Sequence, residues 1–263
     1  MRIVSSAWQT DLALLEASGS TVEDHGTHCV VRTADNPTYH WGNFLLLPRP
    51  PAAEEVDGWL AAFDTAFPGS GHVAIGIDAP QGSEADVAVW AARGFETDLS
   101  AVMTADRLGP APSGGPQVRV RALVSDGDWG QRVALSLACH GGGTDDSAYA
   151  DFARRRAVAE RRLTDVGLGD WFGVFDGDLM VAGLGIFRAG PGLARFQDVE
   201  THPAHRRRGL ATALVHAASR HAYDALGSAT LVIVADPSYH AYRLYERVGF
   251  RRTESQLQVS LVR

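Results

Sequence analysis

The sequence predicts an α/β protein made of two units in tandem, each a mostly antiparallel mixed sheet flanked by helices. Two observations lead to this fold class. Residues 109–116, GPAPSGGP, contain only Gly, Pro, Ala and Ser, a composition that neither packs into a core nor holds a helix. Strand-like and helix-like patterns then alternate on either side of this segment. We therefore expect a domain at 1–112, a linker at 113–116 and a second domain at 117–263.

The second domain begins with a strand, two helices and a meander of strands. QVRVRALV alternates like a strand, and the next stretch, ending at His140, is a helix that Asp126 or Asp128 can cap. In the helix after it, Tyr149 and Leu163 belong to an apolar stripe at helical spacing, which leaves an arginine-rich face for solvent. Asp176-Gly177 then predicts a hairpin between two strands, and LARFQDVETHP is the following strand.

The next element is a strand-to-helix turn that carries concentrated positive charge. The segment THPAHRRRGLATALVHA, residues 201–217, places three arginines and a glycine just before an alanine-rich helix. The unpaired N–H groups and the dipole of a helix start favour an anion, and glycine lets a phosphate approach the backbone closely. The alternative is three solvated surface arginines. A buried strand, a turn at Asp236-Pro237, a short helix ending at Gly249-Phe250 and a last strand follow.

The composition narrows the class of protein further. With 263 residues, 45% hydrophobic and 21% charged, the chain is a folded globular protein, and a net charge of -7 argues against nucleic acid or anionic membranes as partners. No apolar run approaches the roughly 18 residues of a membrane span, and Asp11 and Glu16 stand where a signal peptide would be apolar. We expect a cytoplasmic protein.

No metal site is expected either. Cys29 and Cys139 lie far apart without metal-ligand spacing, so they predict neither a disulfide framework nor a zinc site. His202 and His205 do not share a helical face, because Pro203 separates them ahead of the helix.

In this order the motifs of residues 117–263 resemble the GNAT superfamily of N-acetyltransferases. Arg206, Gly209 and Ala211 match the Arg/Gln-x-x-Gly-x-Gly/Ala loop that binds acetyl-coenzyme A in that family. THP matches the end of its cofactor strand, and AYRLYERVGF its late helix. The resemblance implies acetyl-coenzyme A as co-substrate and a complete cofactor-binding unit within 117–263.

The resemblance also implies the residues of the site. The cofactor would meet the following residues of the strand end, the loop, the helix start and the later turn: Val199, Thr201, Arg206, Arg207, Arg208, Gly209, Leu210, Ala211, Thr212 and Ser238. At the last of these positions the family often has asparagine. Glu200 is the expected base, with Asp198 as the alternative, and Tyr245 is the expected acid for the leaving thiolate. Structural carboxylates and a core aromatic are the alternatives for these residues.

The first half resembles a degenerate copy of the same unit. An offset of 155 residues carries Pro48 onto Pro203, Trp90 onto Tyr245 and Gly94-Phe95 onto Gly249-Phe250. The same offset puts Glu54 in place of the loop glycine, and this carboxylate would repel a phosphate. Chance similarity between two α/β units is the alternative.

We therefore expect acetyl transfer from acetyl-coenzyme A to an amine by direct attack in a ternary complex. The acceptor is a small-molecule or peptide amine, and a homodimer is left open. The alternative is a non-catalytic acyl-coenzyme A sensor. The segment CHGGGTDDSAY is where acceptor contacts are expected, with Asp145 and Asp146 as partners for a cationic amine.

Overall fold

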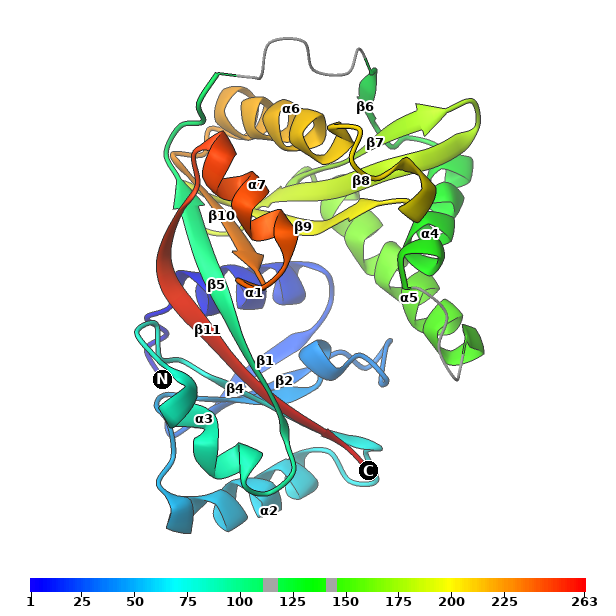
Figure 1. Cartoon of the computed structure of the whole chain (residues 1–263). Helices are drawn as coiled ribbons and strands as arrows, with labels where there is room; N and C mark the ends of the chain where they lie inside the picture. The colour runs from blue at the N-terminus through cyan, green and yellow to red at the C-terminus, as the bar shows by residue number, and fades with distance from the viewer. Residues whose placement is uncertain (111–117, 141–145) are drawn as a thin grey trace. The chain divides into compact units, whose positions relative to one another are not determined.

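The structure is a computed structural model of the chain, and it describes residues 1–110, 118–140 and 146–263. The predicted linker, 113–116, lies outside these residues, as do residues 141–145 of the predicted acceptor segment 139–149. The chain forms two compact units (Figure 1). The first is Met1–Met103 with Val234–Tyr239 and Arg252–Arg263, and the second is Thr104–Ile233 with His240–Arg251. Neither unit is contiguous in sequence. The first unit includes the C-terminal strand, and the second unit is interrupted by Val234–Tyr239.

The first unit is a mixed sheet between helices. Its elements are α1 (Ser6–Ala17), β1 (Thr21–Asp24), β2 (Cys29–Arg32), η1 (His40–Gly42), β3 (Phe44–Leu47), η2 (Ala53–Glu55), α2 (Val56–Ala66), β4 (His72–Ile77), α3 (Glu84–Ala91), β5 (Glu96–Ala105) and β11 (Arg251–Val262). The strands follow the order β1-β2-β3-β4-β11-β5. The β3–β4 pair is parallel, whereas β1–β2, β2–β3 and β4–β11 are antiparallel.

Strand β3 shows why helices are needed on both faces of this sheet. Its pattern FLLL leaves all four side chains buried. Phe44 and Leu46 pack in one cluster with Trp8 of α1, while Leu45 and Leu47 pack in another with residues of α2 and α3. Successive side chains of a strand point to opposite faces, so α1 covers one face and α2 and α3 cover the other.

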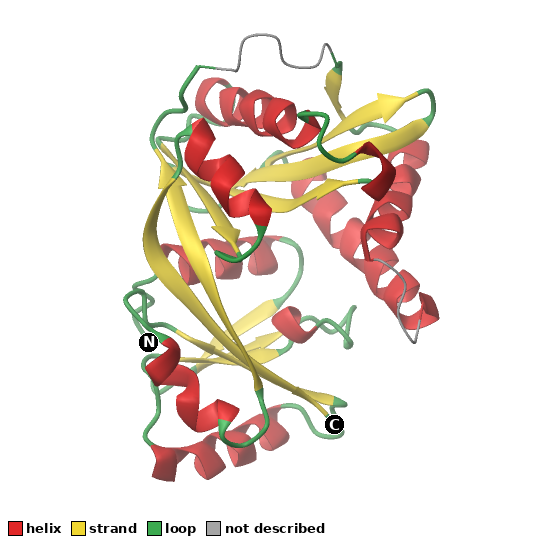
Figure 2. Ribbon diagram, in the orientation of Figure 1, coloured by secondary structure: helices red, strands yellow, loops and turns green. Residues whose placement is uncertain are grey.

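The second unit repeats this architecture (Figure 2). Its elements are β6 (Val120–Ala122), α4 (Asp126–His140), α5 (Asp146–Asp165), β7 (Gly169–Asp176), β8 (Leu179–Arg188), β9 (Leu193–Thr201), η3 (Pro203–His205), α6 (Leu210–Asp224), β10 (Thr230–Ala235) and α7 (His240–Val248). The strand order is β10-β9-β8-β7-β6. Only the β9–β10 pair is parallel; β6–β7, β7–β8 and β8–β9 are antiparallel.

Neighbouring residues of β7 show how the helices sandwich this second sheet. Asp170 and Phe172 contact His221 of α6, whereas Trp171 between them lies under Arg132 of α4. Helix α6 therefore covers one face and α4 the other. Between them β8 is buried continuously from Met180 to Phe187.

The two units share the turn that the internal repeat predicts. The Phe95 N–H donates to the Trp90 carbonyl at 3.2 Å, and the Phe250 N–H donates to the Tyr245 carbonyl at 3.0 Å. Gly94 and Gly249 adopt positive φ of 82° and 113° in these turns, a conformation that glycine adopts without steric cost. Each phenylalanine meets its aromatic partner edge to face. The repeat is thus present in backbone geometry as well as in sequence.

The position of β11 leads to a prediction about truncation. This strand pairs with β4 from Leu257 to Val262, and its Leu257 and Val259 are fully buried. A fragment of residues 117–263 lacks β4, so we expect it to expose β11 as an apolar edge and to aggregate or to melt without a cooperative transition. Size-exclusion chromatography and circular dichroism melts test this.

The control is the full chain cleaved once at a protease site placed within 113–116, which keeps both strands. We expect this nicked protein to remain together and to melt cooperatively. A monomeric 117–263 fragment with a cooperative melt would contradict the prediction.

Within the described part of the chain, no helix is long and apolar enough to cross a membrane.

Candidate active site

Strand β9 carries a β-bulge at the predicted base. Gly185 and Gly183 of β8 face Gln197 and Glu200 of β9, so one residue of β8 stands opposite two of β9, Asp198 and Val199. Asp198 has a φ of 38°, which a residue with a side chain rarely adopts. Bulges of this kind often re-aim side chains beside active sites.

The same strand also parts from its other neighbour. The parallel pairing of β9 with β10 covers Leu193 to Arg195, opposite Thr230 to Val232, while β9 itself continues to Thr201. The backbone of Val199 and Thr201 lies in the section beyond this pairing. Strand β9 therefore has no pairing with β10 over the section that contains Val199 and Thr201.

The arginine loop joins this strand end to α6. Gly209 is the residue before α6 and has a φ of 76°, and Arg207 has a φ of 61°. No acidic residue lies in the first turn of α6, where the N–H groups of Leu210, Ala211 and Thr212 have no intrahelical partner. Left-handed residues followed by a helix start present several N–H donors to one anion.

The three arginines of the loop lie in different surroundings. Arg206 is tied to the strand end, because its Nε donates to the Thr201 carbonyl at 3.2 Å and its side chain bonds the Cys139 thiol of α4. Arg208 lies 3.4 Å from the ring nitrogen of His205. All three side chains are exposed. The structure thus gathers positive charge at the start of α6, next to β9.

The matching position in the first unit is closed by the chain's own carboxylate. Glu55, just before α2, accepts the Ala52 N–H at 2.7 Å and pairs with both terminal nitrogens of Arg49, at 2.7 and 2.9 Å. The Arg49 guanidinium and this backbone bond lower the pKa of Glu55 to about 2, so that the group is anionic at neutral pH. An anionic side chain of the protein itself therefore lies at this helix start, whereas the first turn of α6 has no acidic residue.

Glu200 lies against a buried arginine. Its side chain is 17% exposed, and its carboxylate lies 3.1 Å from a terminal guanidinium nitrogen of Arg132. Burial raises the pKa of Glu200 to about 7, outweighing the opposite effect of Arg132. Asp198, the alternative base, also contacts Arg132, at 3.0 Å, but its side chain is 41% exposed. Burial raises its pKa as well, but the charges of Arg156 and Arg132 outweigh burial, and the pKa of Asp198 is lowered.

The sequence analysis did not identify three of the charged residues that surround Glu200. Arg132 of α4 and Glu160 of α5 are 3% and 2% exposed, and two pairs of their atoms lie 3.3 Å apart. Arg156, expected on a solvated face, instead lies 3.1 Å from Glu160 and donates to Gln197 of β9. Glu160 lies on the same face of α5 as the buried residues Ala153, Ala157 and Leu163. An acidic residue on the apolar face of a helix indicates a buried acid, and this was the signal in the sequence.

Tyr245 lies in α7 and is 5% exposed. Its ring packs edge to face on Phe250, which in turn contacts Phe196 of β9. Ser238 belongs to the other unit, and its hydroxyl donates to Asp236 at 2.7 Å. The contact of Ser238 with a cofactor stays a prediction.

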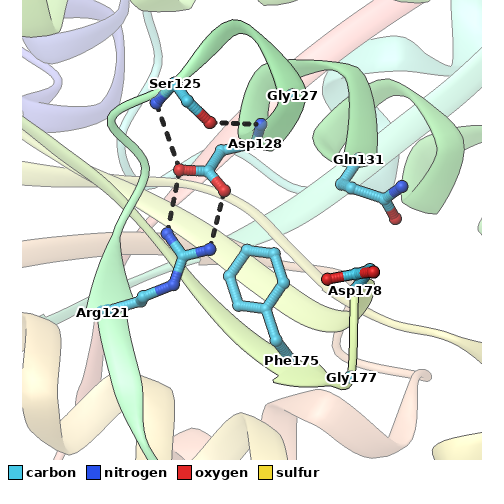
Figure 3. Close-up of a pocket in the computed structure, with 8 residues that line it drawn as sticks. All are labelled: Arg121, Ser125, Gly127, Asp128, Gln131, Phe175, Gly177 and Asp178. Atoms are coloured by element: carbon cyan, nitrogen blue, oxygen red, sulfur yellow. Dashed lines mark hydrogen bonds and ion pairs between the residues drawn. The ribbon is translucent and has the colours of Figure 1, made fainter.

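A separate pocket of about 300 Å³ lies between the start of α4 and the β7–β8 turn (Figure 3). There Arg121 stacks on Phe175, 3.9 Å from the ring centre, and forms a two-fold ion pair with Asp128. None of the predicted site residues lines it. The charges of this ion pair satisfy each other, so the pair offers little to a charged ligand.

The fold and the loop together define an α/β domain with an arginine-rich helix start beside a bulged strand. Residues 140–250 match the family model described as the acetyltransferase (GNAT) family. This match confirms the resemblance to a GNAT acetyltransferase domain that the motifs of this part of the chain predict. No curated protein matches the chain.

Solved structures resemble the whole chain. A GCN5-related N-acetyltransferase from Kribbella flavida has 15% identity and a TM-score of 0.66, with 98% of this chain and 96% of that chain covered. An acetyltransferase of the GNAT family from Novosphingobium aromaticivorans has 21% identity and a TM-score of 0.59, with 96% and 94% covered. A tandem GNAT protein from the clavulanic acid biosynthesis pathway has 11% identity and a TM-score of 0.55, with 95% and 87% covered. These likenesses confirm the fold of two tandem GNAT-like domains.

Proposed function

We propose that the protein transfers an acetyl group from acetyl-coenzyme A to an amine by direct attack in a ternary complex. The observation that carries this proposal is the arrangement within one unit. The arginine loop and the start of α6 directly follow the bulged end of β9, and Glu200 lies in that bulged section. A cofactor held by its phosphates at the loop could lay its thioester along β9.

The base must remove a proton from the acceptor amine before the amine can attack. A primary amine with a pKa near 10.4 is almost entirely protonated at pH 7, and removing its proton costs about 4.6 kcal/mol. Glu200, with a pKa raised to about 7, accepts that proton better than an ordinary carboxylate. The amine lone pair then forms the C–N bond with the thioester carbonyl carbon.

The remaining steps release the thiol. Backbone N–H groups of the splayed section of β9, at Val199 and Thr201, hold the carbonyl oxygen as it becomes negative. The C–S bond breaks, and Tyr245 donates its hydroxyl proton to the departing thiolate. As the amide forms, its nitrogen loses a second proton, which returns through solvent to the Tyr245 phenolate. Glu200 releases to solvent the proton it took, and the products are the acetylated amine and coenzyme A.

Calorimetry with acetyl-coenzyme A, run beside a thiol-release assay over a panel of amines, tests the proposal. We expect binding and turnover with at least one class of amine. Binding without turnover on any amine favours the acyl-coenzyme A sensor, and absence of binding contradicts both functions.

The raised pKa of Glu200 predicts the pH dependence of turnover. The base must be ionised to act, so kcat at saturating acceptor should rise about tenfold per pH unit on the acidic side and level off near pH 7. In Glu200→Gln we expect a loss of roughly 10²-fold together with loss of this acidic limb. A Glu200→Gln enzyme with the unchanged limb would assign the base elsewhere.

A further inference from the structure

Arg132 bridges the bulge of β9. One terminal nitrogen of its guanidinium lies 3.0 Å from Asp198, and the other lies 3.1 Å from Glu200. These two acids flank Val199 in the bulge, where Asp198 holds its φ of 38°. Because both nitrogens belong to one rigid plane, the orientation of that plane sets where the two carboxylates are held. The position of Glu200 therefore depends on what supports the guanidinium.

The guanidinium lies over the ring of Trp171. Its carbon is 4.2 Å from the ring centre, and Trp171 is fully buried. An aromatic face attracts the cation, and a guanidinium stacked on it keeps its N–H groups for hydrogen bonds in its own plane. The indole N–H makes no hydrogen bond with any residue that the structure describes. The ring face is thus the part of Trp171 that acts on Arg132.

Two glycines of β8 make room for this ring. Trp171 of β7 stands opposite Gly185, and Gly183 stands opposite Glu200 of β9, so these positions all point to one face of the sheet. A Cβ added at Gly185 would lie 2.8 Å from Cε3 of Trp171, and one added at Gly183 would lie 3.2 Å from its Nε1. The indole therefore lies across β8, over both glycines, with Arg132 on its other side.

We propose that Trp171 is a positioning residue, which holds the Arg132 guanidinium where it bridges the β9 bulge and so fixes the position of Glu200. The two glycines of β8 matter for the site because a side chain at either position would displace the ring. The inference rests on the proposed function only for the role of Glu200 as base; the support of Arg132 by Trp171 is a property of the free protein.

The titration of Glu200 reports where Arg132 lies, because the positive charge of Arg132 lowers the pKa of Glu200. Other charged or titratable groups face this cluster from α4, α5, β9 and the arginine loop: Cys139, Tyr149, Arg156, Glu160, Arg195, Asp198 and Arg206. None of them is removed by a substitution at Gly185 or Trp171. A midpoint that moves in such a variant therefore reflects a displaced Arg132 and not the loss of another charge.

Gly185→Ala tests the proposal. The new methyl group would press on Trp171 and displace Arg132 from Glu200, so the midpoint of Glu200 should rise by about one pH unit. Carbon-13 NMR of the full chain labelled at glutamate carboxyl carbons measures this midpoint, and Glu200→Gln assigns the signal. Trp171→Leu removes the aromatic face and should also raise the midpoint. Trp171→Phe keeps an aromatic face and should raise it less.

The matched control is Gly173→Ala in β7, a position on the same sheet that is comparably crowded. A Cβ there would lie 2.8 Å from Phe175 and 3.0 Å from Met180, and none of its three nearest atoms belongs to Trp171. We expect Gly173→Ala and Gly185→Ala to lower the melting temperature by similar amounts, and only Gly185→Ala to move the midpoint of Glu200.

Several results would overturn the proposal. One is a midpoint that does not rise in a folded Gly185→Ala or Trp171→Leu protein, and another is an equal rise in Gly173→Ala. Equal shifts in Trp171→Leu and Trp171→Phe would also overturn it, since the aromatic face would then have no effect. Should Gly185→Ala fail to fold by circular dichroism, the comparison of the two Trp171 variants decides.

The titration needs no acceptor, so its result is independent of whether an amine is acetylated. If the midpoint shifts appear but no amine reacts, the support of Arg132 by Trp171 stands and the proposed function fails. If amines react but the midpoint stays, that support fails alone. In the active enzyme the acidic limb of kcat should move to higher pH with the midpoint in Gly185→Ala. A merely structural role would instead lower activity at every pH without moving the limb.

Discussion

Gly209→Glu is expected to abolish binding of coenzyme A, lowering affinity by at least 10³-fold. The new carboxylate would stand at the start of α6, where the backbone offers its N–H groups to the pyrophosphate. It would also force a side chain onto a φ of 76°. Calorimetry with coenzyme A measures the loss, and circular dichroism confirms that the variant still folds.

The matched control is Glu54→Gly, the same exchange in reverse at the equivalent position of the first unit. It should leave both affinity and stoichiometry unchanged at one coenzyme A per chain. Next to it, Glu55 already occupies the start of α2 and pairs with Arg49. Two equivalents bound by the native chain would refute this account.

The sequence predicted the fold and the backbone turns at the helix ends because these depend on local chemistry. A helix start with Gly209 before it, and a helix end with Gly249 after it, have backbone requirements that few residue types meet. The offset that links Gly94 to Gly249 worked for the same reason. The pairing of the C-terminal strand β11 with β4 of the first unit was not predicted, because no local sequence pattern determines which neighbour a strand pairs with.

The acidic cluster was missed because it forms from three elements distant in sequence. Arg156 follows two arginines that are exposed, and composition alone cannot separate it from them. Its partner Gln197, and the partners of Arg132 in β9, become neighbours only when α4 and α5 pack on the sheet. The cluster forms only in the folded chain, and no segment taken alone contains it.

Tyr245→Phe is expected to lower turnover by roughly 10²-fold, the usual contribution of a positioned acid, with little change in cofactor affinity. Phenylalanine keeps the edge-to-face contact with Phe250, so the packing of α7 should survive and the hydroxyl alone is tested. Burst-phase or single-turnover kinetics must show that chemistry limits the rate. Melting temperatures of the two proteins check the packing.

The control for this substitution is Tyr242→Phe, which removes a hydroxyl from the same helix about one turn earlier. Tyr242 is less buried, and turnover should be unchanged there. Equal turnover in Tyr245→Phe and the native enzyme would show that Tyr245 only packs in the core. Its 5% exposure and its counterpart Trp90 in the first unit fit that role. Trp90 is fully buried and meets Phe95 in the same way, yet its ring N–H is a far weaker acid than a phenol. A selective loss in Tyr245→Phe would therefore show that the two copies kept one packing position and that only the second uses it for proton transfer.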